Sequence, residues 1–218
     1  MRSKFDEQLA LLNRDLTKMG SLCEEALALA AKALANALAN ADGQTAAKIA
    51  PIDSEIDQME RTIESLCLKL LLQQQPVARD LRQISAALKM ITDMERIGDQ
   101  ASDIAEIIGF LNGRIGTDAQ YICQMAVAAM RMVTESVEAY VKRDVAMAEA
   151  TIQHDDVVDD LFLKVKESLI QMISVNPKDG EYALDLLMIA KYFERIGDHA
   201  TNIAEWVVFS VTGVHEQG

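Results

Sequence analysis

The sequence predicts an all-α protein built from two tandem three-helix bundles. Three observations support this prediction: the chain repeats itself once, its apolar residues recur every three or four positions, and its 218 residues include only 3 prolines and 10 glycines. Half of the residues are hydrophobic and a quarter are charged, which is enough apolar material for a sizeable core. The scarcity of turn-forming residues argues against an all-β fold.

The internal repeat is clearest in two segments of similar sequence. Residues 94–106 read MERIGDQASDIAE, and residues 193–205 read FERIGDHATNIAE. Earlier landmarks keep nearly the same offset, since Asp53 and Asp57 match Asp155 and Asp159. A unit of about 100 residues is too long for a stacked solenoid repeat. We therefore expect two bundles that are related by internal duplication, residues 1–112 and 113–218, joined by the glycine-rich residues 109–116.

Each unit contains amphipathic helices. Ile52, Ile56, Met59 and Ile63, for example, fall on one face of a helix, as apolar residues at this spacing do. Breaks at proline and glycine divide the chain into six expected helices, over residues 3–41, 44–74, 77–111, 117–142, 145–175 and 179–212. The connections are short, so consecutive helices are expected to be antiparallel.

The charge balance restricts the possible partners. The net charge is −13, with acidic residues spread over both halves. Such a surface repels phosphate backbones and anionic lipids, which excludes nucleic acid as a partner class and favours metal cations or basic protein surfaces. The three widely spaced cysteines indicate reduced core thiols, and the sequence shows neither a signal peptide nor an apolar span, so a cytoplasmic location is expected.

Acidic residues form stripes on two expected helices of the first unit. Glu95, Asp99, Asp103 and Glu106 lie within an arc of about 80° on a helix that turns 100° per residue. The preceding helix has a similar stripe, whose members are Asp53, Asp57, Glu60 and Glu64. The second unit keeps these stripes in part: its matching residues are Glu194, Asp198, Asn202 and Glu205 on one helix, and Asp155, Asp159, Phe162 and Lys166 on the other.

The stripes are expected to meet. When the helices are folded into hairpins, Asp57 lies at the height of Glu95 and Asp53 at the height of Asp99, and the second unit gives the same matches. Clustered carboxylates are suited to hard cations such as Mg²⁺, Mn²⁺, Ca²⁺ or oxo-bridged iron. The alternative interpretation is a solvated acidic face that binds no ion.

Three further residues bear on these helices. Gly98 and Gly197 occupy equivalent mid-helix positions, which indicates either the close approach of another backbone or inheritance through the duplication. Pro51 has no counterpart in the second unit and is expected to kink its helix just before Asp53.

No catalytic constellation is visible in the sequence. It contains no Glu-x-x-His motif of a di-iron site, no phosphate-binding GxxxxGK[ST] loop, no GxGxxG and no GxSxG. His199 is interpreted as a surface residue rather than a ligand, and Arg96 and Arg195 as partners of neighbouring acids. The chain is therefore not expected to be an enzyme.

The doubled Glu-Arg-Ile-Gly-Asp motif, in tandem three-helix units that span the whole chain, resembles the PhoU family of bacterial phosphate-transport regulators. The resemblance implies a cytoplasmic protein, commonly a homodimer, that acts with the phosphate ABC transporter and a phosphate-sensing histidine kinase and meets the membrane only through them. It also implies clusters of iron or zinc, or binding of Mg²⁺ or Mn²⁺. The implied metal ligands are Asp53, Asp57, Glu95, Asp99 and Asp103 in the first unit, and Asp155, Asp159, Glu194 and Asp198 in the second.

Three functions follow from these observations. The first is a metal-binding, non-enzymatic regulator that holds the phosphate-starvation response off and couples transporter to kinase. The second is a metal-free helical scaffold whose acidic faces dock on basic partners. The third is a metal-dependent phosphohydrolase. The sequence argues against this function, because it offers no general base or nucleophile beside the carboxylates. The second unit is expected to bind metal less well, because Asn202, Phe162 and Lys166 replace acidic residues of the first unit.

Overall fold

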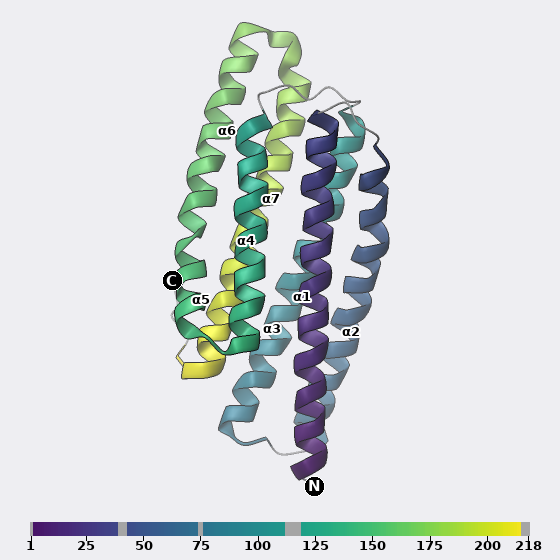
Figure 1. The fold of residues 1–218 in the computed structure, drawn as a ribbon, viewed down its shortest axis with the longest axis vertical. Helices are drawn as coiled ribbons and strands as arrows, with labels where there is room; N and C mark the ends of the chain where they lie inside the picture. Colours follow the sequence, from purple (N-terminus) through teal and green to yellow (C-terminus); the bar gives the residue numbers. More distant parts are fainter. Residues whose placement is uncertain (1, 39–42, 74–75, 112–118, 215–218) are drawn as a thin grey trace.

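The computed structural model describes residues 2–38, 43–73, 76–111 and 119–214, which are almost entirely helical and include no strand (Figure 1). In chain order the elements are α1 (Arg2–Leu38), the 3₁₀ helix η1 (Gly43–Lys48), α2 (Ile49–Gln73), α3 (Ala78–Phe110), α4 (Gln120–Lys142), α5 (Val145–Gln153), α6 (Asp155–Val175), the 3₁₀ helix η3 (Pro177–Asp179) and α7 (Gly180–Thr212). The predicted all-α class is confirmed.

Two three-helix bundles lie side by side along a common long axis (Figure 1). The first consists of α1, α2 and α3, and the second of α4, α6 and α7, with the short α5 beside them. The bundles meet where α3 and α7 pack against each other in antiparallel directions. Asp93 of α3 accepts a hydrogen bond from Asn202 of α7 at 3.0 Å, while Asp103, later in α3, interacts with Tyr192, earlier in α7. The predicted tandem bundles are therefore present.

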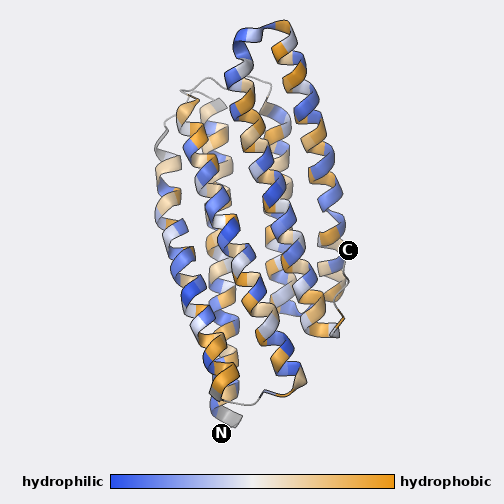
Figure 2. Ribbon diagram, turned by 180° about the vertical axis from the view of Figure 1, so that it is seen from behind, coloured by the Kyte–Doolittle hydropathy of each residue, from blue (hydrophilic) through white to orange (hydrophobic). Residues whose placement is uncertain are grey.

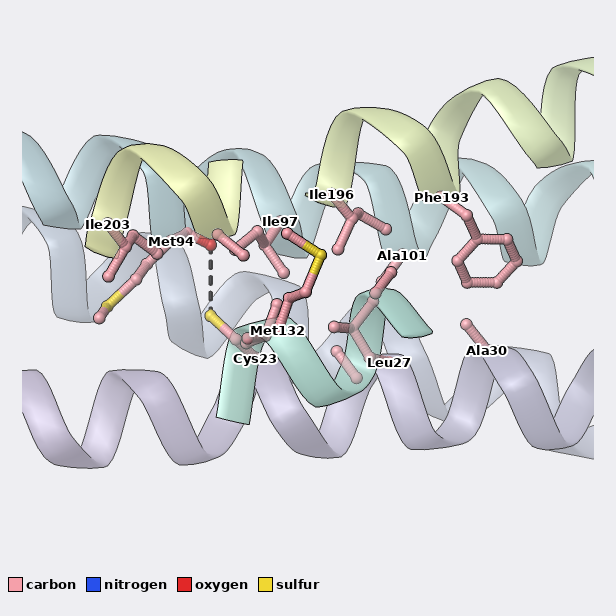
Figure 3. Close-up of a cluster of buried hydrophobic side chains, with 14 of the residues drawn as sticks. Cys23, Leu27, Ala30, Met94, Ile97, Ala101, Met132, Phe193, Ile196 and Ile203 are labelled. Carbon is pink, nitrogen blue, oxygen red and sulfur yellow. Dashed lines mark hydrogen bonds between the residues drawn. The ribbon is translucent and has the colours of Figure 1, made fainter. Parts of the chain in front are cut away.

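The two bundles share one hydrophobic core. Figure 3 shows Cys23 and Leu27 of α1, Ile97 of α3, Met132 of α4 and Ile196 of α7 packed into a single cluster. All five side chains are almost completely buried. The amphipathic stripes of the sequence therefore face both their own bundle and the other one.

The cysteines belong to this packing, as expected. Cys23 and Cys67 are free and buried, and Cys123 is free and half-buried. The Cys23 thiol donates a hydrogen bond to the carbonyl oxygen of Met94, at 3.3 Å (Figure 3). Burial raises the pKa of the Cys67 thiol to about 12, so this thiol stays protonated near neutral pH.

The helix prediction is wrong at one break in the second unit. The single helix expected over residues 145–175 is interrupted at His154, where α5 ends and α6 begins. Asp144 marks the start of α5, because its side chain accepts a hydrogen bond from the backbone N–H of Met147 at 3.0 Å and satisfies a donor of the first turn. The last helix also begins differently, since the short η3 precedes α7.

Pro51 does not kink a longer helix. The single helix expected over residues 44–74 is also wrong, because the first unit changes from the 3₁₀ helix η1 to α2 at Ile49, two residues before the proline. Pro51 therefore lies in the first turn of α2, where backbone N–H groups have no partner within the helix and a missing N–H costs little. Both units thus have a helical break just before their first aspartate, Asp53 in one and Asp155 in the other.

The predicted joint of the two units lies mostly outside the described residues. Gly109 and Phe110 belong to the end of α3, and the chain is described again from Ala119. The proposed boundary between residues 112 and 113 therefore stays a prediction, as does the end of the first helix beyond Leu38.

Hydrophilic and hydrophobic residues are interspersed along the helices, with no long purely hydrophobic stretch in this view (Figure 2). Within the described residues, no helix combines the length and the apolar character that crossing a membrane requires.

Candidate metal centre

The first acidic cluster is assembled by the antiparallel pair of α2 and α3. Asp53 and Asp57 lie one turn apart on α2, and Asp99 faces them from α3. One carboxylate oxygen of each residue lies within 4.8 Å of the other two. Carboxylate oxygens on opposite sides of a hard cation are separated by about 4 to 5 Å, which is twice the metal–oxygen distance. The three carboxylates therefore meet, as the matched heights in the sequence predict, at a spacing that suits one ion, and their role as metal ligands stays a prediction.

Asp53 is the most constrained member of this cluster. Its Oδ2 accepts a hydrogen bond from the hydroxyl of Ser102 at 2.9 Å. Its Oδ1 is buried and has no hydrogen-bond donor among the described residues. A buried carboxylate oxygen without a donor is costly, and a bound cation would satisfy it.

Gly98 explains how Asp53 reaches this position. A Cβ at Gly98 would lie 2.9 Å from Asp53 Oδ1 and 3.0 Å from Ile56 Cδ1, so any larger residue would push the carboxylate away. Gly197 has the same role in the second unit, where a Cβ would lie 3.2 Å from Asp155 Oδ1. A close approach is confirmed at both glycines, but the approaching group is an aspartate side chain rather than a second backbone.

The carboxylates of the first cluster destabilise one another's charged forms. Burial raises the pKa of Asp53, and the charges of Asp99, Asp57 and Asp103 raise it further, while the hydrogen bond from Ser102 lowers it. The pKa of Glu95 is raised by burial and then by Asp99.

Two arginines offset part of this repulsion from the outside. Arg96 lies 3.0 Å from Asp99 and 3.4 Å from Glu95, as expected from its position, and Arg61 lies 3.8 Å from Asp57. Both arginine side chains are more than half exposed, so these ion pairs are weak.

Glu95 and Asp103 lie beside the three aspartates rather than among them. Glu95 interacts electrostatically with Asp99, Glu60 and Asp57. Asp103 interacts with Asp53 and, across the junction of the bundles, with Tyr192 of α7, whose pKa is raised by burial and by this carboxylate. Glu95 and Asp103 make the electrostatic potential at the three aspartates more negative, and their role as metal ligands remains a prediction.

The second acidic cluster has a different arrangement. Asp155, Asp159, Glu194 and Asp198 interact through their charges. Within the described part of the chain, the group of three aspartates in the first unit is the only one of three or more carboxylate, histidine or cysteine ligands at single-ion spacing. Burial, followed by the charges of Asp198 and Asp159, raises the pKa of Asp155 to about 6.

Several residues of these sites were missed in the sequence. Ser102 orients Asp53, and Lys191 forms an ion pair with Glu194. Comparing the two repeats position by position would have found Lys191, because Thr92 occupies the matching position of the first unit. His199 is not simply a surface residue: its Nδ1 lies 2.8 Å from Asp93 Oδ1 at the junction of α3 and α7.

The chain was also compared with known proteins. A sequence model described as the PhoU domain matches residues 16–108 and again residues 122–207. The chain is 35% identical to a phosphate-specific transport system accessory protein PhoU homologue of Clostridium acetobutylicum, over 97% of this chain and 96% of that protein. A homologue of the same name from Synechocystis is 36% identical, over 99% of this chain and 94% of that protein.

Solved structures agree with the sequence relatives. The crystal structure of PhoU from Pseudomonas aeruginosa superposes with a TM-score of 0.90 at 33% identity, covering 96% of this chain and 100% of that one. A phosphate transport system regulatory protein PhoU from Streptococcus pneumoniae gives a TM-score of 0.87 at 25% identity, covering 98% and 99%. These proteins are accessory and regulatory proteins with a helical scaffold, and theirs is not an enzyme family. The chain belongs to the PhoU family.

Proposed function

We propose that this protein regulates phosphate uptake and phosphate-starvation signalling from the cytoplasm, and that it binds metal at its first acidic cluster. Its relatives are named as accessory proteins of the phosphate-specific transport system, and a structural relative as a regulatory protein of phosphate transport. In this proposal the chain contacts components of the phosphate ABC transporter and a phosphate sensor histidine kinase, as a homodimer. It restrains both while phosphate is plentiful.

The observation that supports metal binding is the group Asp53, Asp57 and Asp99, in which one buried oxygen of Asp53 has no donor in the described part of the chain. A cation bound there would offset both the burial and the repulsion that raise the pKa of Asp53. It would also join α2 to α3 and give the acidic face a fixed shape that a partner protein can recognise. Oxygen-only ligands favour Mg²⁺ or Mn²⁺, while the resemblance to the family also implies iron or zinc.

Metal analysis of the purified protein tests the binding part of the proposal. Equilibrium dialysis against Mn²⁺, followed by elemental analysis, is expected to show bound metal in the wild type and an affinity lower by about tenfold or more in Asp99→Asn. Asp6→Asn is the matched control, since Asp6 is an exposed aspartate on α1 and loses the same charge. No metal above background, after incubation with Mg²⁺, Mn²⁺, Zn²⁺ and Fe³⁺ in turn, would contradict metal binding.

Gene deletion tests the regulatory part separately. Alkaline phosphatase is expected to be derepressed in phosphate-rich medium when the gene is deleted, and to be repressed again by the wild-type gene supplied in trans. An unchanged phosphatase level in the deletion strain would contradict the regulatory function. Asp99→Asn, tested in the same strain, shows whether repression requires the first cluster.

A metal-free scaffold is the second candidate function. Arg96 and Arg61 already balance some of the cluster's charge, and basic groups of a partner protein would balance the rest. This alternative predicts normal repression by a protein that contains no metal. The phosphohydrolase alternative is not proposed, because the chain belongs to a family of accessory proteins.

A further inference from the structure

The two repeats differ at the positions that surround their acidic clusters. Lys191 on α7 corresponds to Thr92 on α3, and Phe162 on α6 corresponds to Glu60 on α2. The second unit has therefore gained an ammonium group and lost a carboxylate next to its cluster. These two changes involve residues that contact each other in the structure, since Lys191 Nζ lies 5.4 Å from the centre of the Phe162 ring.

Lys191 points into the second acidic cluster. Its ammonium group forms an ion pair with Glu194, whose side chain is only 14% exposed. It also acts electrostatically on Asp159 and Asp198, so it neutralises charge on both α6 and α7. The Phe162 ring provides a favourable face for this cation.

The cations beside the first cluster are more exposed than Lys191. Thr92 is exposed and uncharged. Arg96 and Arg61 pair with cluster carboxylates, but their side chains are 55% and 63% exposed, against 39% for Lys191. Three aspartate oxygens still converge there at single-ion distance.

We propose that Lys191 is the built-in cation of the second acidic cluster, and that it restricts metal binding to the first cluster. This inference rests on the proposed metal binding of the first unit, and it departs from the family resemblance, which implies metal ligands in both. Glu194, Asp159 and Asp198 are then partners of a lysine rather than ligands, and Asp155 keeps only its carboxylate neighbours. A metal ion would have to displace an ammonium group that is already paired within the protein, which costs the ion pair with Glu194 and the contact with Phe162.

Removing the lysine should open the second cluster. The variant Lys191→Thr copies the residue of the first unit, and we expect it to bind additional Mn²⁺ in equilibrium dialysis of the full chain. The double variant Lys191→Thr/Asp198→Asn should lose this gain. Lys191→Arg keeps the positive charge and should bind no more Mn²⁺ than the wild type, and Lys178→Thr controls for the loss of a lysine elsewhere on the surface. Circular dichroism of each variant reports whether it is folded.

Wild-type binding should be insensitive to Asp198→Asn and strongly weakened by Asp99→Asn. Wild-type Mn²⁺ that is lost in Asp198→Asn would overturn the inference, as would a folded Lys191→Thr protein that binds no additional metal. The proposed metal binding of the first unit fails in a different way, through an Asp99→Asn variant that binds as much Mn²⁺ as the wild type. The additional Mn²⁺ bound by Lys191→Thr can be measured whether or not the first cluster binds metal.

Discussion

Gly98 and Gly197 show how single residues set the geometry of the acidic clusters. Each lies in the middle of a long helix, where glycine costs about 1 kcal/mol relative to alanine. Each faces an aspartate of the neighbouring helix, at a distance that leaves no room for a methyl group at Gly98 and little room at Gly197. The intrinsic cost of the glycine is offset by the close contact between helices that it permits.

Replacing these glycines gives a graded prediction. Gly98→Ala is expected to lower the free energy of unfolding by about 1–2 kcal/mol, because overpacking costs more than the gain in helix propensity. Gly197→Ala should cost less, since its nearest atom is 3.2 Å rather than 2.9 Å away. Gly109→Ala, with no atom within 4 Å, should be neutral or stabilising by up to about 1 kcal/mol. Urea denaturation measures all three, and a Gly98→Ala protein as stable as Gly109→Ala would refute the steric argument.

Asp155 gives a prediction about pH. Its pKa is raised from 3.8 to about 6 in the folded protein. Between these values the folded state binds more protons than the unfolded state, so Asp155 makes the free energy of unfolding decrease as pH rises from about 4 to 6. Asp155→Asn should therefore stabilise the protein at pH 7, by about 1–2 kcal/mol after allowance for partial exposure, and flatten its pH dependence. Thermal unfolding in EDTA from pH 4.5 to 7.5 checks this; equal slopes in both proteins would contradict it.

At the scale of the elements, the spacing of apolar residues located the long helices well, but it did not locate the breaks. The pattern of Val158, Leu161, Val165 and Leu169 continues smoothly from the preceding residues. A break of one residue at His154 hardly disturbs a period of 3.6, so periodicity alone cannot reveal it. In the first unit, η1 was assigned to a longer α-helix because a 3₁₀ helix of six residues is too short to show a period of its own.

The cap of α5 can be tested directly. Asp144→Ala removes the acceptor for the N–H of Met147 and should lower the free energy of unfolding by about 1 kcal/mol. Glu149→Ala, which alters an exposed residue of the same helix, is the control and should change stability by less than about 0.5 kcal/mol. The measurement is chemical denaturation followed by circular dichroism, and equal effects of the two substitutions would argue against a capping role.

The candidate site was partly predictable for a related reason. Matched heights on a helical hairpin follow from chain length and helix rise, so the meeting of Asp53, Asp57 and Asp99 could be foreseen. The contact of Lys191 with Glu194 depends on the direction in which a long, flexible side chain turns. The pairing of Asp93 with His199 depends on how one bundle packs on the other. The spacing of residues along a single helix therefore could not predict either contact.

At the scale of the whole molecule, the shared core makes the two bundles one thermodynamic unit. Side chains of α1, α3, α4 and α7 interdigitate (Figure 3). A hydrogen-bonded group adds a second link, because Asn13 Oδ1 on α1 accepts from Gln83 of α3 at 2.8 Å and from Tyr140 of α4 at 2.6 Å. Opening one bundle therefore exposes apolar surface of the other.

Cooperative unfolding is the corresponding prediction. Phe193 lies in the central cluster and is fully buried, and Phe193→Ala should cost about 3–5 kcal/mol. Hydrogen exchange in increasing urea should then show α2 and α6, the outer helices of different bundles, becoming less protected together. Loss of protection in α6 alone, with α2 unchanged, would show that the bundles unfold independently. Leu184→Ala, at an exposed position of the same helix, serves as control.

The shared core also bears on how the two copies could diverge after the duplication. A substitution at an interior position of one repeat has to suit side chains contributed by the other, so interior positions evolve under joint constraint. Positions on the outer faces of α2, α6 and their partners escape that constraint. The glycines Gly98 and Gly197, where the helices pack closely, are the same in both repeats. By contrast, Glu60 of the first repeat corresponds to Phe162 of the second, and Thr92 corresponds to Lys191. Because the two repeats share one hydrophobic core, functional divergence between them is confined mainly to surface positions.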